Sequence, residues 1–170
     1  MRWSKAEQQL SAELTKRTDM QFGINFREFL GAYFTMVLWC TEFGRGSHVR
    51  FRIDNTTAVA WTEGHGCRYL GAQAGLRLMG LMEAVHCVYT SAVHIPGVEN
   101  DWPDAGSRLW TSPEAEAKFA DLSRGYVQVA VEEPWRTPLH AWEYFCSTQL
   151  LPGQAKSSIS KHGSNGAIGA

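Results

Sequence analysis

Apolar and polar residues follow two different periods in the first two thirds of the chain. Over residues 49–53, three apolar residues alternate with two arginines, which predicts a half-buried strand. Apolar residues recur at helical spacing over residues 26–40 and 69–85, and residues 88–95 predict a second strand. A strand, a helix and another strand in this order predict a parallel α/β unit.

Shorter elements lie between and after these segments. A short helix is predicted over residues 56–62, before a glycine-rich turn, and Asp101 opens another helix. Ser112 and the proline after it open a helix that runs to Leu122, and the alternation over Tyr126–Val131 predicts a strand. The aromatic residues after that strand are predicted to pack on the core rather than stack on bases: Trp135, Trp142, Tyr144 and Phe145.

The composition predicts one domain of ordinary size, because the chain has 170 residues, of which 44% are hydrophobic. A net charge of −1 gives no overall nucleic-acid signature, although arginines gather locally. The four cysteines form no Cys-x-x-Cys pair, which disfavours a zinc site. No signal peptide or long apolar run is evident, so we expect an intracellular protein with no membrane partner, in cytoplasm or nucleus.

Three acidic residues, Glu28, Asp54 and Asp104, lie on three separate predicted elements. Asp54 directly follows a strand, which is where open α/β sheets bind their ligands. Carboxylate oxygens are preferred ligands of Mg²⁺, and acids from several elements can hold cations against a phosphodiester. Each acid also has a structural alternative. Asp54 and Asn55 can cap the next helix, while the other two acids suit the first turns of helices.

Three short motifs contain these acids. Residues 25–28 read Asn-Phe-Arg-Glu at the start of an apolar helix, and residues 53–55 read Ile-Asp-Asn at the end of a strand. Residues 94–108 follow the pattern His-x-Pro-Gly-x-x-Asn-x-x-x-Asp-x-x-Ser-Arg. Together the motifs resemble the ribonuclease H domain attached to reverse transcriptases of retroelements, of the tyrosine-recombinase and long-terminal-repeat kinds. The resemblance covers residues 24 to about 110 and implies a ribonuclease-H-like α/β fold, a mixed sheet with flanking helices.

The resemblance also implies an activity, hydrolysis of the RNA strand of RNA·DNA hybrids by two-metal catalysis. Glu28, Asp54 and Asp104 match metal ligands of the family, for Mg²⁺ or Mn²⁺. His94 matches a mobile histidine that is thought to help protonate or release the product. The implied nucleic-acid contacts, together with the local arginines, are Asn55, Asn100, Arg50, Arg52 and Arg108.

The chain departs from the family pattern in one important respect. The family's first catalytic Asp stands on a strand well before the Glu helix, whereas the only Asp before Glu28 is Asp19, just ahead of that helix. We therefore expect the first strands to be missing, which leaves unpaired sheet edges. The alternative functions are a catalytically inactive nucleic-acid-binding remnant or a relic with no stable fold. Pro103 and Gly106, where relatives usually carry Ala and Leu, also weaken the helix of the late Asp.

These observations divide the chain into four expected parts: an N-terminal remnant over 1–23, a ribonuclease-H-like core over 24–110, a helix and strand extension over 111–151, and a disordered Gly/Ser-rich tail over 152–170. The expected partners are an RNA·DNA hybrid or another nucleic acid, and an upstream segment of a reverse transcriptase. The strongest expectation is thus a ribonuclease-H-like domain without its first acid.

Overall fold

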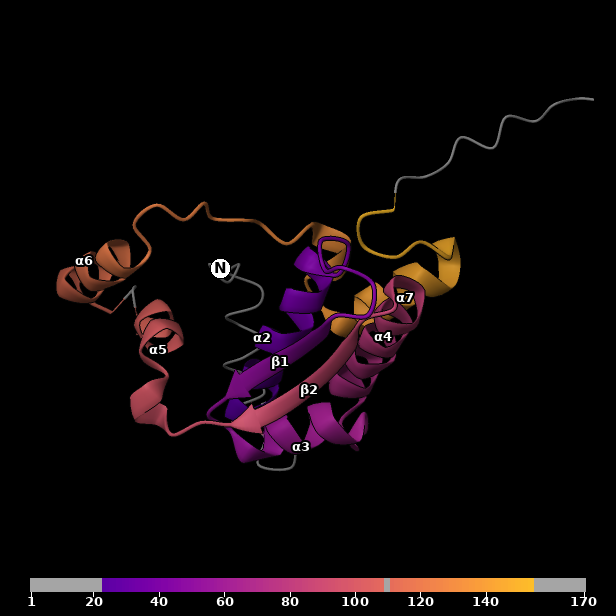
Figure 1. Ribbon diagram of the computed structural model, residues 1–170, viewed down its shortest axis with the longest axis horizontal. Coiled ribbons are helices and arrows are strands. Elements are labelled where there is room, and N and C mark those ends of the chain that lie inside the picture. Colours follow the sequence, from indigo (N-terminus) through magenta and orange to yellow (C-terminus); the bar gives the residue numbers. More distant parts are fainter. Residues whose placement is uncertain (1–22, 109–110, 155–170) are drawn as a thin grey trace, which may run out of the picture.

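The computed structural model describes residues 23–108 and 111–154. Its elements, in chain order, are α2 (Ile24–Trp39), β1 (His48–Ile53), α3 (Thr56–Gly64), α4 (Leu70–His86), β2 (Tyr89–His94), the 3-10 turn η1 (Gly97–Glu99), α5 (Asp101–Arg108), α6 (Pro113–Leu122), the 3-10 turn η2 (Glu133–Trp135) and α7 (Pro138–Thr148). Figure 1 shows α5 and α6 on one side of the molecule and α4 and α7 on the other, with the two strands between them.

The two strands form a parallel sheet, as the sequence predicted. Their register runs from His48 opposite Tyr89 to Ile53 opposite His94. Helices α3 and α4 connect the strands, which satisfies the need of a parallel pair for a long crossover. The α/β class with flanking helices is therefore confirmed. In the described part of the chain the sheet is a two-stranded parallel sheet and not the mixed sheet that we expected.

One face of the sheet and the inner faces of the helices form the core. Phe51, Ile53 and Ala92 are buried, whereas Arg50 and Arg52 lie exposed on the opposite face. The largest fully buried side chains come mainly from α2 and α4: Phe29, Tyr33, Met36, Leu78, Met79 and Met82. The Leu/Met stripe of the second long helix is thus part of the core, as its helical spacing indicated.

The C-terminal extension packs against this core. Trp135 is buried at 4% exposure, and Tyr33 donates a hydrogen bond from its hydroxyl group to the Trp135 carbonyl oxygen at 3.0 Å. The guanidinium carbon of Arg77 lies 5.5 Å from the ring centroid of Trp142, a cation–π contact between α4 and α7. The prediction that the late aromatic residues pack on the core is confirmed.

The strand predicted over Tyr126–Val131 is wrong. This segment joins α6 to η2 without a hydrogen-bonded partner strand in the described residues, and Tyr126 and Val127 are 72% and 87% exposed. Only Val131 is buried. Alternation indicates which side chains share a face, but a strand also needs a neighbouring edge to pair with. The extension over 111–151 therefore consists of helices and linkers.

Two expectations lie largely outside the described residues. Of the remnant over 1–23, only Gly23 is described, and of the tail over 152–170, only residues 152–154 are described. Within the described ranges, no helix is both long and apolar enough to cross a bilayer.

Close packing at Gly75 leads to a prediction about stability. A Cβ atom on Gly75 would lie 2.8 Å from Cε1 of the fully buried Phe29 and 3.3 Å from Cβ of Pro138. Gly75→Ala is expected to destabilise the fold, because overpacking costs about 1–3 kcal/mol. Gly80→Ala, on the same helix with nothing within 4 Å, is expected to stabilise it by roughly 0.5–1 kcal/mol. Urea unfolding of both variants measures the difference, and equal stabilisation would contradict the packing described.

Candidate functional site

Asp54 stands at the edge of the sheet where both parallel strands end. β1 ends at Ile53, whose carbonyl oxygen accepts a hydrogen bond from the Ile95 amide at 3.0 Å, just past the end of β2. Asn55 caps α3, since its Oδ1 accepts from the Ala58 amide at 2.9 Å. The capping alternative therefore applies to Asn55, and the Asp54 carboxylate makes other contacts.

Two side chains hold the Asp54 carboxylate from different elements. Asn100 follows η1, is only 7% exposed, and donates from Nδ2 to Asp54 Oδ2 at 2.9 Å. Glu28 lies on the long helix α2, and its carboxyl group shares a hydrogen bond with that of Asp54. One residue from each of the three motifs thus meets in one cluster, which we call the carboxyl cluster: Glu28, Asp54 and Asn100.

A hydrogen bond between two asparagine side chains holds the start of α2 beside the start of α3. Asn55 donates from Nδ2 to Asn25 Oδ1 at 2.9 Å. This contact positions Glu28, one turn further along α2, beside the end of β1. The sequence contained Asn25 within the first motif, but its partner, 30 residues away, was not predicted.

The proton balance of the carboxyl cluster follows from its burial. Burial raises the pKa of Glu28 first, and the negative charge of Asp54 and their hydrogen bond raise it further, while Arg27 lowers it. The pKa of Glu28 thus lies above its usual value, and a cation between the two carboxyl groups would compete with a proton on Glu28.

Asp104 is not part of the carboxyl cluster. It lies on α5 and pairs with Arg108 one turn later, with Nε 2.9 Å from Oδ1. No group of three or more His, Cys, Asp or Glu side chains within 23–108 and 111–154 is arranged to hold a metal ion. The structure thus brings two of the three predicted metal ligands together and leaves the third in a local ion pair.

The remaining predicted residues lie around the sheet. His94 is exposed at the end of β2, opposite Ile53 in the register. Arg50 is exposed on the outer face of β1, and Arg52 pairs with Glu99, with Nη2 3.0 Å from Oε2. Two of the three predicted arginines, Arg52 and Arg108, thus already have carboxylate partners. Glu99, the partner of Arg52, carried no sequence signal beyond its place in the third motif.

The carboxyl cluster contains oxygen atoms of the kind that a hard cation prefers. Its two carboxyl groups offer oxygen ligands, and Mg²⁺ in proteins is commonly bound by one or two carboxylates together with water and substrate phosphates. The side-chain amide of Asn100 holds Asp54 in place, as residues that hydrogen-bond to a metal ligand commonly do.

The raised pKa of Glu28 predicts an unusual effect of its replacement. The pKa of Glu28 is higher in the folded than in the unfolded chain, so protonation of Glu28 contributes to the stability of the fold. This contribution is complete below the pKa of Glu28 in the unfolded chain. It is lost as the pH rises through the pKa of Glu28 in the folded chain. Glu28→Gln, which stays neutral, is expected to melt at a higher temperature than the wild type at pH 7. The difference should shrink as the pH falls and disappear below the pKa of Glu28 in the unfolded chain.

Thermal unfolding between pH 4 and 8, without divalent cations, measures this difference. Glu114→Gln is the control of opposite sign, since a hydrogen bond from Ser112 lowers the pKa of the exposed Glu114. A Glu28→Gln variant that melts below the wild type at pH 7 would mean that folding does not raise the pKa of Glu28.

The resemblance stated from the sequence depends on the three motifs, and the structure brings one residue of each together. The acid of the third motif, Asp104, pairs with Arg108 instead. A comparison with known proteins adds no further assignment: no family model matches the chain, and neither the curated proteins nor the solved structures give a significant match.

Proposed function

We propose that this chain is a ribonuclease-H-like domain of the kind attached to retroelement reverse transcriptases, which acts on the RNA strand of RNA·DNA hybrids with a divalent cation. The observation that carries the proposal is the carboxyl cluster: Glu28, Asp54 and Asn100 come from three motifs and meet where two parallel strands end. Ligands commonly bind at this edge of an α/β sheet.

The residues of the carboxyl cluster have separate roles in this proposal. Asp54 and Glu28 hold Mg²⁺ or Mn²⁺, which would bind phosphate oxygens and activate water for hydrolysis. Asn100 holds Asp54 in a fixed orientation through its 2.9 Å hydrogen bond. Because burial and the charge of Asp54 raise the pKa of Glu28, protons would compete with a cation there, and cation binding should strengthen as the pH rises. Exposed His94, in the same edge region, is available to exchange a proton with the product.

A second function, binding of the hybrid without cleavage, is favoured by the position of Asp104. Its carboxylate pairs with Arg108 at 2.9 Å instead of joining the other two acids. One cation can bind and orient a phosphate, whereas the two-metal mechanism needs ligands for a second cation about 3.5–4 Å away. We therefore expect hybrid cleavage to be slow at best, with binding as the more robust property.

The binding part of the proposal is tested by the salt dependence of hybrid affinity. Arg50 is exposed and has no carboxylate partner in the described residues, so it is available to a phosphate. The affinity of the wild type should fall with salt, and Arg50→Gln should reduce the log–log slope by about 1. Arg124→Gln is the matched control, because Arg124 is an exposed arginine ion-paired with Asp121 on α6. An affinity independent of salt would contradict binding through phosphates.

A further inference from the structure

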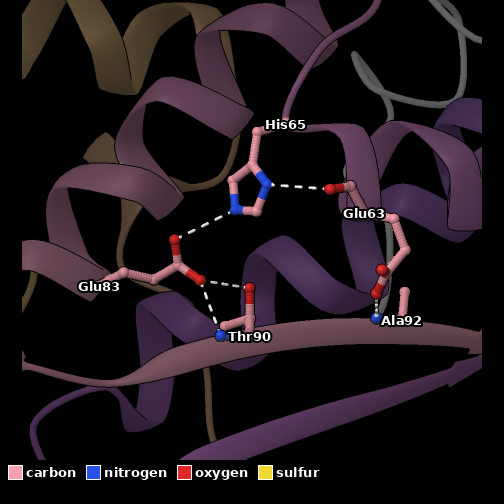
Figure 2. Close-up of polar contacts among 5 residues, drawn as sticks. All are labelled: Glu63, His65, Glu83, Thr90 and Ala92. Carbon is pink, nitrogen blue, oxygen red and sulfur yellow. Dashed lines mark hydrogen bonds and ion pairs between the residues drawn. The ribbon is translucent and has the colours of Figure 1, made fainter.

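The free edge of β2 is closed by two glutamates. Alternate residues of a strand direct their backbone groups to opposite edges, and the β1 register directs those of Thr90 and Ala92 away from β1. Glu83 on α4 accepts from the Thr90 amide at 2.8 Å and from the Thr90 hydroxyl group. Glu63 on α3 accepts from the Ala92 amide. Figure 2 shows both carboxylates reaching the strand, with His65 beside Glu83.

The free edge of β1 has no such closure in the described part of the chain. Val49, Phe51 and Ile53 face β2 in the ladder, so the amide and carbonyl groups of His48, Arg50 and Arg52 point to the other edge. No group within the described ranges bonds to those amides, and all three residues are exposed. An open row of donors and acceptors is a template for pairing with another strand.

The side chains of β1 define what kind of strand fits this edge. The outer face carries His48, Arg50 and Arg52, and the inner face carries Phe51 and Ile53, which belong to the core. Neighbouring strands are stabilised by opposite charges and apolar pairs across the ladder. A complementary strand therefore alternates acidic residues on the outer face with apolar residues on the inner face.

A second copy of the chain is a poor occupant of this edge. Pairing β1 with itself would place Arg50 and Arg52 of one copy beside those of the other, and like charges across a ladder are unfavourable. Residues 1–22 and 155–170, which lie outside the described residues, lack the required pattern as well. Glu7, Glu13 and Asp19 lie six residues apart, and residues 155–170 contain no acid.

We propose that the free edge of β1 binds an extended strand from outside residues 1–170, about six residues long, in which acidic and apolar residues alternate. The occupant is added by backbone hydrogen bonds to His48, Arg50 and Arg52, and one of its acids pairs with Arg50, because Arg52 already pairs with Glu99. This proposal does not depend on the proposed action on hybrids, because it follows from the two unequal edges of the sheet.

The test uses the full chain and a capped eight-residue peptide that alternates valine and glutamate. Hydrogen exchange at single amides, followed by NMR, is expected to slow by about tenfold at His48, Arg50 and Arg52 on addition of the peptide. Exchange at Thr90 and Ala92 should stay unchanged, because the two glutamates already cap that edge. A peptide with lysine in place of glutamate should have little effect.

Two substitutions separate the backbone contribution from the charge contribution. Arg50→Pro removes one outward amide while the ladder residues on either side, Val49 and Phe51, keep their bonds to β2, and proline is tolerated at such edges. It should abolish the slowing of exchange. Arg50→Gln keeps the amide and should weaken peptide affinity by about two- to fivefold.

Several results would overturn the proposal. Protection of the three amides without peptide would mean that the chain itself covers the edge, and self-association in sedimentation would assign the edge to a second copy. Equal responses to both peptides, or none, would show that the edge does not recognise such a strand. If Arg50→Pro does not fold, the lysine peptide and Arg50→Gln still decide the outcome.

Discussion

Asp54→Asn is expected to weaken the binding of Mn²⁺ by at least about 100-fold, since loss of even an outer partner of a metal site costs about 10–100-fold. Asp54 is one of only two carboxyl groups in the carboxyl cluster, and Asn100 already orients it. The substitution should leave the fold intact, because Asn55 and not Asp54 caps α3.

Isothermal titration of Mn²⁺ into the wild type and the variant measures this effect. Asp121→Asn is the matched control, since Asp121 is an exposed carboxylate on α6 that pairs with Arg124. Equal affinities for the wild type and Asp54→Asn, with a weaker Asp121→Asn, would assign cation binding to another part of the chain.

Asn100→Asp is expected to destabilise the fold strongly at neutral pH and to make stability depend on divalent cations. Asn100 is only 7% exposed and donates to Asp54, so a carboxylate in its place would set a further acid against the carboxylate of Asp54, beside Glu28. An uncompensated buried charge costs about 3–5 kcal/mol, and the partial exposure of Asp54 reduces this to about 2–4 kcal/mol.

Two conditions should restore the stability of Asn100→Asp. Lower pH protonates the added acid, and Mg²⁺ or Mn²⁺ would offset the negative charge of the added acid and of Asp54. Urea unfolding at pH 5 and 7, with and without cation, measures both effects. Asn100→Leu, which cannot charge, separates them from simple loss of the hydrogen bond. If cations stabilise Asn100→Leu as much as Asn100→Asp, the added carboxylate does not contact a cation.

The sequence predicted the elements whose pattern is local and regular. The strand over 49–53 and the helical stripe over 69–85 formed as expected, because alternation and helical spacing each fix which side chains face the core. By contrast, Tyr126–Val131 alternates but does not form a strand. The helix α7, opened by Thr137 and Pro138, was not predicted, although a proline at its first position is a known helix start.

The order of the motifs predicted part of the candidate site, but it did not predict where Asp104 lies. The order of the motifs indicated that Glu28, Asp54 and Asn100 belong to one site, and these residues are in contact. Asp104 shares the same motif as Asn100, but a local ion pair with Arg108 determines its side-chain position. Spacing along the chain cannot decide between such a local partner and a distant one.

The glutamates that close β2 illustrate the same limit. Glu63 lies 29 residues from Ala92 and has no motif around it, so only the packing of α3 on β2 brings the two together. Contacts of this kind depend on the three-dimensional path of the chain, and single-sequence patterns contain no signal for them.

The proposed action on RNA·DNA hybrids depends on cation binding by the carboxyl cluster. The most direct measurement is an assay with a hybrid labelled on each strand, in Mg²⁺, in Mn²⁺ and in chelator, with the wild type and Asp54→Asn. We expect cation-dependent hybrid binding and slow cleavage of the RNA strand alone, strongest in Mn²⁺, both lost in Asp54→Asn. Binding without any product would support the inactive alternative. Hybrid binding and cleavage that are identical in the wild type, in Asp54→Asn and in chelator would contradict the account.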